Sequence, residues 1–450
     1  MKPDKGQEQA ARNTRTVSAE RRDEPSRAVV LVPIQRTGVS DNPLRSSESK
    51  LAEAVGLAGA IDIEIVHSAI CWLNNITPAT LFGSGKVEEL AGIVQSMEAE
   101  LVIVDHALTP VQQRNLEKAW KAKVIDRTGL ILEIFGQRAS TREGVLQVQL
   151  AHLNYQKGRL VRSWTHLERQ RGSTGFIGGP GETQIEADRR ILQDKIVKLE
   201  KELEQVRRTR TLHRSKRKKV PHPVVALVGY TNAGKSTLFN TLTGATVRAK
   251  DMLFATLDPT LRRLTLPHGR MVILSDTVGF ISDLPTHLVA AFRATLEEVL
   301  EADLILHVRD MSDPDNAAQA ADVTRILHEL GVRDEGEGST KIIEVWNKID
   351  LLPYETVESM EARREETTAV PVSATTGQGV EFLLETIELT LSGRLINRDI
   401  TIGVNDMSQL NWLYEHAKVH SREDREDGSV ALNLDITEHD MSDLQRRLAH

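Results

Sequence analysis

The sequence predicts a multidomain α/β protein, and three observations support this fold class. The chain has 450 residues, which implies about three domains at roughly 100–200 residues each. Short apolar runs alternate with helical segments in two separate stretches, as in βαβ units with parallel sheets. A long helical segment lies between those stretches. We therefore expect a parallel-sheet N-terminal domain, a helical hairpin linker, a second α/β domain and a small α+β C-terminal domain.

The composition restricts the class of protein. The chain is 40% hydrophobic and carries a net charge of -7, so it can bury cores, and any basic surface must be local. Cys71 is the only cysteine, which excludes an intrachain disulfide and fits a reducing compartment. No apolar run reaches the ~18 residues of a membrane span, and the N-terminus lacks a signal-peptide core. We expect a cytoplasmic monomer without stable membrane insertion.

The N-terminal stretch divides into a tail and an α/β domain. Residues 1–26 carry many charges and almost no large apolar side chains, so we expect them to be disordered. Residues 27–140 contain apolar runs typical of strands, at 28–32, 61–66, 101–105 and 123–126. Helical segments separate these runs, at 47–58, 85–98 and 110–121. The alternation predicts a parallel sheet.

Residues 141–220 are predicted to form a helical hairpin. A long helix is indicated from Glu182 to about Arg210. Its apolar residues follow one another at alternating steps of four and three: Leu192, Ile196, Leu199, Leu203 and Val206. Such a seam needs a partner helix, and the segment around 146–168 is the best candidate.

Two further features of this hairpin point to a partner. The first is a cluster of glycines, which consists of Gly172, Gly175, Gly178, Gly179 and Gly181. This cluster either allows a close approach to RNA or to another domain, or forms a plain hinge before the helix. Lysine and arginine dominate residues 207–219, where no acidic residue occurs. This basic run either binds RNA phosphates in a salt-sensitive way or forms a solvated helix face, and we favour RNA.

Residues 221–392 are predicted to form a Ras-like domain around a phosphate-binding loop (P-loop). An apolar strand at 224–228 leads into this loop, which consists of Gly229, Tyr230, Thr231, Asn232, Ala233, Gly234, Lys235 and Ser236. The glycines let backbone N–H groups face phosphates, and the following helix adds a partial positive charge. Lys235 is expected to reach the β- and γ-phosphates, and the Ser236 hydroxyl to ligate Mg²⁺.

Two more segments indicate Mg²⁺ and a conformational switch. The strand at 271–275 ends in Asp276-Thr277-Val278-Gly279. There Asp276 can hold Mg²⁺ through water and the Gly279 amide can sense the γ-phosphate. The first switch is expected in Phe254-Ala255-Thr256-Leu257-Asp258. Thr256 and Thr260 are both candidate Mg²⁺ ligands by spacing, and we favour Thr256. Lys235, Thr256 and Gly279 are the candidate catalytic residues.

The last two motifs are expected to recognise the base of the nucleotide. Asn347-Lys348-Ile349-Asp350 follows the strand 341–346, and Ser373-Ala374-Thr375 follows 369–372. A carboxylate at Asp350 can accept from N1–H and the exocyclic amine of guanine, a donor pair that adenine lacks. Lys348 can cover the base, and a backbone N–H at 373–374 can reach the guanine O6. The order of these motifs predicts GTP and GDP as ligands and GTP hydrolysis as the reaction.

One position departs from Ras-type enzymes. Phe280 follows Gly279, where those enzymes carry a glutamine that orients the attacking water. A phenylalanine cannot do this, so we expect slow intrinsic hydrolysis and a further contribution from another group, a partner or a monovalent cation. Asn232 in the P-loop suggests K⁺ as a second cofactor beside Mg²⁺.

Several segments together resemble the HflX family, in the Obg–HflX group of translation-factor-class GTPases. They are Gly178-Gly179-Pro180-Gly181-Glu182-Thr183-Gln184 with Asp188-Arg189-Arg190, residues 254–258, residues 276–281, and Gly83-Ser84-Gly85-Lys86 with Glu88-Glu89-Leu90. The likeness covers about residues 28–400, and it also implies Mg²⁺ ligation by Thr256. Residues 393–450, with a strand-like run at 430–434 and a helical one at 441–448, resemble the variable C-terminal domain of longer members.

The resemblance implies work on the ribosome. Members bind the large ribosomal subunit and its rRNA and, in bacteria, separate stalled or heat-damaged ribosomes during stress, with hydrolysis stimulated by ribosomes. Two alternatives stay open. One is a GTP-gated regulatory binding module without ribosome splitting. The other is an RNA-remodelling enzyme that also uses ATP in the N-terminal domain, although Gly83-Ser84-Gly85-Lys86 lacks P-loop spacing and is better explained as a helix entry.

Overall fold

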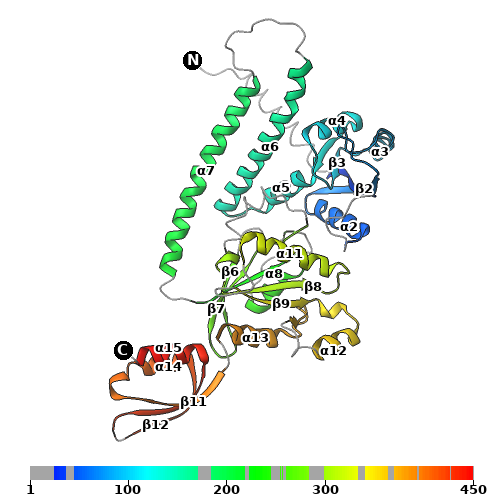
Figure 1. Cartoon of the computed structure of the whole chain (residues 1–450). Helices are drawn as coiled ribbons and strands as arrows, with labels where there is room; N and C mark the ends of the chain where they lie inside the picture. Colours follow the sequence, from blue (N-terminus) through cyan, green and yellow to red (C-terminus); the bar gives the residue numbers. More distant parts are fainter. Residues whose placement is uncertain are drawn as a thin grey trace, which may run out of the picture. The chain divides into compact units, whose positions relative to one another are not determined.

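A computed structural model of the chain is shown in Figure 1. It describes residues 25–36, 45–170, 184–217, 222–244, 254, 256, 260–282, 298–332, 340–362, 369–392, 395–425 and 427–448. The chain forms two compact units, residues 1–206 and 207–450, and each is described by itself. No helix within the described ranges is long and apolar enough to cross a membrane. The glycine cluster at 172–181 lies outside these ranges.

The first unit contains a four-stranded parallel sheet in the order β2-β1-β3-β4. Its strands are β1 (Ser26–Gln35), β2 (Ile63–Leu73), β3 (Leu101–Val104) and β4 (Lys123–Asp126). The helices are α2 (Ser47–Ala58), α3 (Ser84–Ser96), α4 (Pro110–Trp120) and α5 (Arg127–Arg138). The continuous apolar run of β1 is buried because the strand lies inside the sheet. The expected second strand starts two residues later and extends to Leu73.

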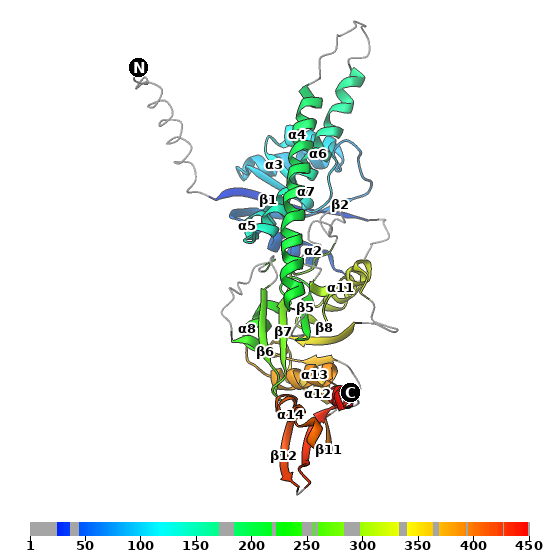
Figure 2. The same ribbon diagram turned by 90° about the vertical axis from the view of Figure 1, so that its left-hand side faces the viewer.

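Two long helices follow, α6 (Arg142–Gln170) and α7 (Gln184–Arg217). Figure 2 shows them beside each other, with the connecting residues outside the described ranges. Two positions of the expected apolar seam, Ile196 and Leu203, are buried. Helix α6 is fixed to the first sheet by Asp126, which accepts hydrogen bonds from the Tyr155 hydroxyl at 2.6 Å and from the Arg159 guanidinium at 2.5 Å.

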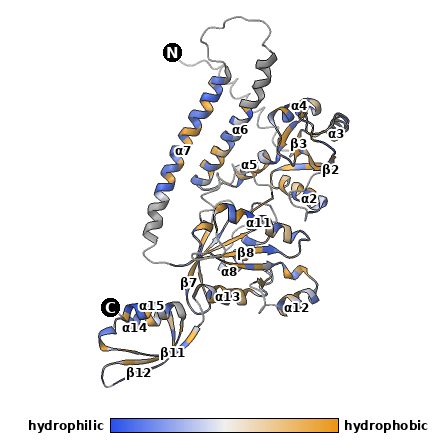
Figure 3. Ribbon diagram, viewed as in Figure 1, coloured by the Kyte–Doolittle hydropathy of each residue, from blue (hydrophilic) through white to orange (hydrophobic). Residues whose placement is uncertain are grey.

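The second unit contains a six-stranded sheet in the order β10-β9-β8-β5-β7-β6. Only β6 is antiparallel to its neighbour. The strands are β5 (Val224–Gly229), β6 (Thr260–Thr265), β7 (Met271–Asp276), β8 (Leu304–Asp310), β9 (Lys341–Asn347) and β10 (Ala369–Pro371). The helices are α8 (Lys235–Thr243), α11 (Asn316–Leu330), η1 (Ile349–Leu351), α12 (Tyr354–Ala362) and α13 (Val380–Ser392). Figure 3 shows the strands of this sheet as mainly hydrophobic, in contrast to α7.

The C-terminal residues form a three-stranded antiparallel sheet in the order β11-β13-β12. It consists of β11 (Leu395–Ile402), β12 (Ala417–Asp424) and β13 (Val430–Thr437), with η2 (Val404–Asp406), α14 (Gln409–His416) and α15 (Glu438–Leu448). The multidomain α/β fold class predicted from the sequence is confirmed. The sequence prediction recognised only β13 and α15 in this part.

Candidate functional site

The P-loop joins β5 to α8, and two of its glycines are required by close contacts. Gly229 has φ of 153°, and a Cβ there would lie 2.2 Å from the Val308 carbonyl oxygen. Gly234 has φ of 91°, and a Cβ there would lie 2.1 Å from Nδ2 of Asn347. Because both contacts are with atoms of the sheet or its strand ends, any side chain at these positions would displace the loop.

Lys235 begins α8 and is buried beneath the loop. Its ammonium donates to the carbonyl oxygens of Gly229, at 3.1 Å, and Tyr230, at 2.7 Å. Burial lowers the pKa of Lys235 to about 8, and the nearby Asp276 carboxylate opposes this shift. The carbonyl oxygens of the loop thus hold the buried Lys235 ammonium in place.

Three side chains from separate segments meet beside the P-loop. Asp276 Oδ2 accepts hydrogen bonds from the hydroxyls of Ser236 and Thr256, each at 2.8 Å, and the two hydroxyl oxygens are 2.9 Å apart. Asp276 is fully buried, and its Oδ1 atom has no hydrogen-bond partner in the described part of the chain. Burial raises the pKa of this carboxyl group.

Only part of the first switch segment is described. Thr256 reaches the Asp276 carboxylate, whereas Thr260 begins β6 and is paired with Asp276 through the backbone register of the sheet. Phe254 is buried with a positive φ of 56°. The remaining candidates of this segment, Ala255, Leu257 and Asp258, lie outside the described residues.

The second switch segment, which starts at Asp276, packs against the P-loop. Thr277 donates its hydroxyl to the Leu227 carbonyl at 2.6 Å, and Val278 is buried. A Cβ on Gly279 would lie 2.9 Å from Thr231 Cγ2 and 3.1 Å from Lys235 Nζ. Only glycine therefore fits at position 279, and its backbone can approach a group bound by the P-loop.

Backbone hydrogen bonds join the P-loop directly to this segment. The Thr231 amide donates to the Phe280 carbonyl at 2.8 Å, and the Phe280 amide donates to the Gly229 carbonyl at 3.1 Å. The Tyr230 hydroxyl accepts from the amide of Ser282 at 2.8 Å. Asn232 is exposed at the tip of the loop with a left-handed φ of 61°.

Asn347 connects the P-loop to the end of β10. Its Nδ2 donates to the Ala233 carbonyl at 2.8 Å, and its Oδ1 accepts from the Ala374 amide at 3.0 Å. Ser373 and Ile349 are buried, while Asp350 and Thr375 are exposed at the same edge of the sheet. The structure thus brings together two motifs that are separated in the sequence.

Lys348 has a partner that the sequence analysis missed. Its ammonium pairs with the Asp310 carboxylate at 2.5 Å, and the residue has φ of 64°. Asp310 ends β8, at the carboxyl edge of a mainly parallel sheet, where ligand-binding residues are commonly found. A charged residue that ends an apolar strand is the sequence signal that could have identified it.

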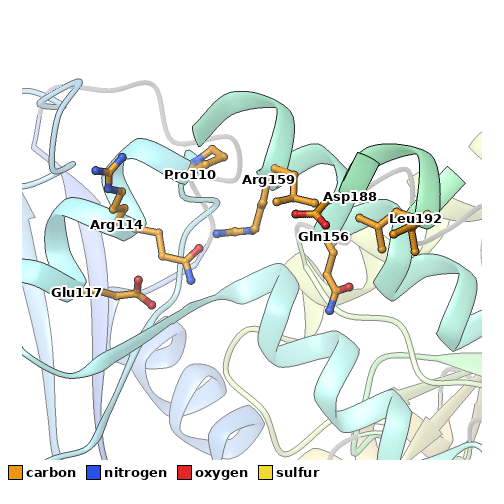
Figure 4. A pocket seen from close by; sticks show the side chains of 10 residues that line it. Pro110, Arg114, Glu117, Gln156, Arg159, Asp188 and Leu192 are labelled. Carbon is orange, nitrogen blue, oxygen red and sulfur yellow. The ribbon is translucent and has the colours of Figure 1, made fainter. Parts of the chain in front are cut away.

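A pocket of about 550 Å³ lies in the first unit, between α4, α6 and α7 (Figure 4). Its lining is mixed in charge, with Arg114 and Arg159 against Glu117 and Asp188. The N-terminus of α4 at this pocket is already capped by Thr109, which accepts from Gln112 N at 3.2 Å. At this pocket α4 therefore does not offer a fully free helix N-terminus to a phosphate.

Two other features predicted from the sequence are the glycine-containing segment at 83–86 and the basic run at 207–219. The first has an ordinary structural role, and the second is described only in part. Gly83 precedes the first turn of α3, and Lys86 pairs with Glu89 at 2.7 Å in that helix. The basic run begins within α7, whose backbone is described to Arg217. Its side chains from 210 onward, including Lys218 and Lys219, lie outside the described residues.

Family comparisons cover nearly the whole chain. Residues 48–136 match "GTP-binding GTPase N-terminal", and residues 138–217 match "GTP-binding GTPase Middle Region". Residues 224–348 match "50S ribosome-binding GTPase", and residues 358–450 match "HflX C-terminal domain". Most of the site described above falls in the segment matched to ribosome-binding GTPases. Ile349 and Asp350 follow that segment, and residues 373–375 fall in the C-terminal match.

Individual proteins are also similar to this chain. GTPase HflX of Magnetococcus marinus is 49% identical over 403 residues, which cover 90% of this chain and 91% of the relative. GTPase HflX of Escherichia coli is 46% identical over 359 residues, covering 79% and 82%. A GTP-binding protein from Sulfolobus solfataricus, solved with GDP, is 24% identical with a TM-score of 0.44, covering 81% and 98%. From the identity and coverage of the curated relatives, the chain belongs to the HflX family and is a GTPase.

Proposed function

We propose that this GTPase binds the large ribosomal subunit and its rRNA in the GTP state and promotes the dissociation of stalled ribosomes. The observation that carries the proposal is the meeting of Ser236, Thr256 and Asp276, because it joins the P-loop to both switch segments. A γ-phosphate can hold both switches in this arrangement, and its loss can release them. Ribosome-stimulated hydrolysis would then detach the protein in the cytoplasm, where it acts as a monomer.

Mg²⁺ fits the three side chains beside the P-loop. The Ser236 and Thr256 hydroxyls offer two oxygen ligands, and Asp276 can bind a metal-bound water through Oδ1, which has no partner within the described residues. A divalent cation would also stabilise the ionised form of this buried carboxylate. Mg²⁺ supplies charge neutralisation of the β- and γ-phosphates during the reaction.

The base pocket and a K⁺ site complete the proposed nucleotide site. The exposed Asp350 carboxylate would accept from guanine, Lys348 would cover the base, and the Ala374 amide is held near it by Asn347. Asn232 stands at the tip of the P-loop, where an amide oxygen can ligate K⁺ beside the phosphates. Equal hydrolysis rates in K⁺ and Na⁺ at the same ionic strength would remove the K⁺ part of this proposal.

The ribosome proposal is tested by GTP hydrolysis with and without purified large subunits, at physiological K⁺ and Mg²⁺. We expect strong stimulation of hydrolysis by large subunits. In a separate experiment, we expect sedimentation of whole ribosomes with the protein and a non-hydrolysable GTP analogue to show the two subunits separating. Replacing the lysines and arginines of 207–219 by glutamine should abolish both effects, since each lost phosphate contact reduces salt-dependent affinity.

A matched control lies on the same helix. Lys198 and Lys201 are exposed on α7 outside the basic run, and their replacement by glutamine should leave stimulation unchanged. Equal losses in both variants would mean that overall charge, and not the basic run, is responsible. No stimulation at all, with GTP binding intact, would instead favour the regulatory binding module.

A further inference from the structure

The HflX chain lacks a side chain at Phe280 that could orient the attacking water. Phe280 is buried, and its backbone amide and carbonyl are both used to hold the P-loop. Its ring offers neither a hydrogen-bond acceptor nor a charge. The polar group that acts on the water must therefore come from another residue near the γ-phosphate, from K⁺ or from the ribosome.

Thr231 presents a hydroxyl whose hydrogen-bonding capacity is unused. The residue is only 6% exposed, and its Oγ1 atom is buried with no hydrogen-bond partner in the described part of the chain. A buried hydroxyl is ordinarily hydrogen-bonded, because leaving it unpaired costs free energy. Its backbone amide donates to the Phe280 carbonyl at 2.8 Å, which holds the residue beside the second switch segment.

Thr231 lies beside Gly279 and Lys235, the two residues that we expect to face a γ-phosphate bound by the P-loop. A Cβ on Gly279 would lie 2.9 Å from Thr231 Cγ2, 3.0 Å from Thr231 Cα and 3.1 Å from Lys235 Nζ. The threonine, the glycine that senses the γ-phosphate and the lysine ammonium thus meet at one place. Oγ1 and Cγ2 share the same Cβ, and one step between staggered χ1 positions brings the hydroxyl to the face where Cγ2 now lies.

We propose that the Thr231 hydroxyl is the catalytic group that orients the attacking water in this GTPase. Oγ1 accepts a hydrogen bond from the water and donates a hydrogen bond to a γ-phosphate oxygen, while it keeps its own proton. The water oxygen forms the new bond to the γ-phosphorus, and the bond to the β–γ bridging oxygen breaks with its electron pair leaving on GDP. The water proton passes to the released phosphate, so Thr231 is unchanged at the end of the reaction.

Two substitutions at one position separate the hydroxyl from the methyl group. Thr231→Val keeps the branched shape and removes the hydroxyl, whereas Thr231→Ser keeps the hydroxyl and removes the methyl group. We expect Thr231→Val to lower the single-turnover rate of GTP hydrolysis by at least about tenfold, because orientation of the nucleophile is lost. Thr231→Ser should stay within about threefold of the parent enzyme, and the affinity for GDP should be unchanged in both.

The control is a threonine far from the nucleotide site. Thr324 on α11 bonds to its own helix, through Oγ1 to the Ala320 carbonyl at 3.0 Å, and Thr324→Val should leave the rate unchanged. The rates are measured without ribosomes, so the result is independent of the proposed ribosome function. A valine variant with the parent rate, or a serine variant as slow as valine, would overturn the proposal, since the side chain would then act by packing alone.

Discussion

The two mainly parallel sheets of this protein differ in whether the polar groups at the carboxyl ends of their strands have partners within the protein. In the first unit, Asp105 follows β3 and pairs with Arg127 at 2.5 Å, while Arg127 also pairs with Glu53 at 2.5 Å. Asp126 at the end of β4 is bonded through both oxygens, to Gly129 N and Tyr155 through Oδ1 and to Leu108 N and Arg159 through Oδ2. At this edge of the sheet, the acids at the strand ends are thus paired with other groups of the protein.

In the second unit, the corresponding edge keeps polar atoms without partners. Asp276 leaves Oδ1 and Thr231 leaves Oγ1 without a hydrogen bond in the described residues, although both residues are buried. Sheet topology alone therefore does not identify a ligand site, because both sheets have strand ends at which a ligand could bind. The difference lies in which strand-end acids and hydroxyls the protein leaves unsatisfied.

The largest expected effect on stability comes from the buried ion pairs of Arg127 in the first unit. Arg127→Ala removes the buried partner of Asp105 and one partner of Glu53, and breaking a buried ion pair costs about 3–5 kcal/mol of unfolding free energy. Chemical denaturation of the first unit measures this loss. The exposed pair of the same unit, Lys86–Glu89, provides the control, since Lys86→Ala should cost at most about 1 kcal/mol. Equal costs for the two variants would contradict the buried role of Arg127.

The second sheet should instead respond through nucleotide chemistry. Lys235→Ala removes the ammonium beneath the P-loop, and we expect GTP hydrolysis to fall by about 10²–10³-fold, as for the loss of a single charge-stabilising donor. ATP hydrolysis should be absent from parent and variant alike, because the first sheet has its strand-end acids already paired. ATP hydrolysis that survives in Lys235→Ala would place a second nucleotide site in the first unit.

The motifs of the candidate site could be predicted from the sequence more fully than the tertiary contacts that support them. The P-loop was predictable because Gly229, Gly234 and Lys235 act within one short segment whose backbone conformation is locally determined. The Asp310–Lys348 pair could not be predicted, because it joins the last residue of β8 to the residue that follows the neighbouring strand β9. Thr231 could be placed in the loop, but only the folded chain shows that its hydroxyl is buried without a partner.

The C-terminal sheet shows the same limit for secondary structure. Its central strand β13 alternates buried and half-buried residues, because it is covered by a neighbour on each side and by apolar packing on one face. That alternation made it recognisable as a strand. The edge strand β12 is mostly exposed and rich in charged residues, so its sequence carries little strand signal.

The smallest expected effect concerns a buried, neutral histidine of the second sheet. His307 lies in β8, and burial lowers its pKa to about 4, while Glu344 opposes this shift and Arg309 and Lys235 reinforce it. The residue is thus kept neutral, unlike the ion-paired Arg127. Its contribution to stability is fully present above the unfolded pKa of 6.5 and is lost as the pH falls towards 4.

At pH 5 this difference amounts to about 2 kcal/mol of unfolding free energy relative to pH 7. His307→Leu removes the titrating group and keeps an apolar side chain, so its stability should fall less between pH 7 and pH 5 than that of the parent protein. Chemical denaturation at both pH values measures the two slopes, and other groups contribute equally to each. Identical slopes would mean that His307 is protonated without penalty, and that the interior of the second sheet accommodates an unpaired charge as readily as water does.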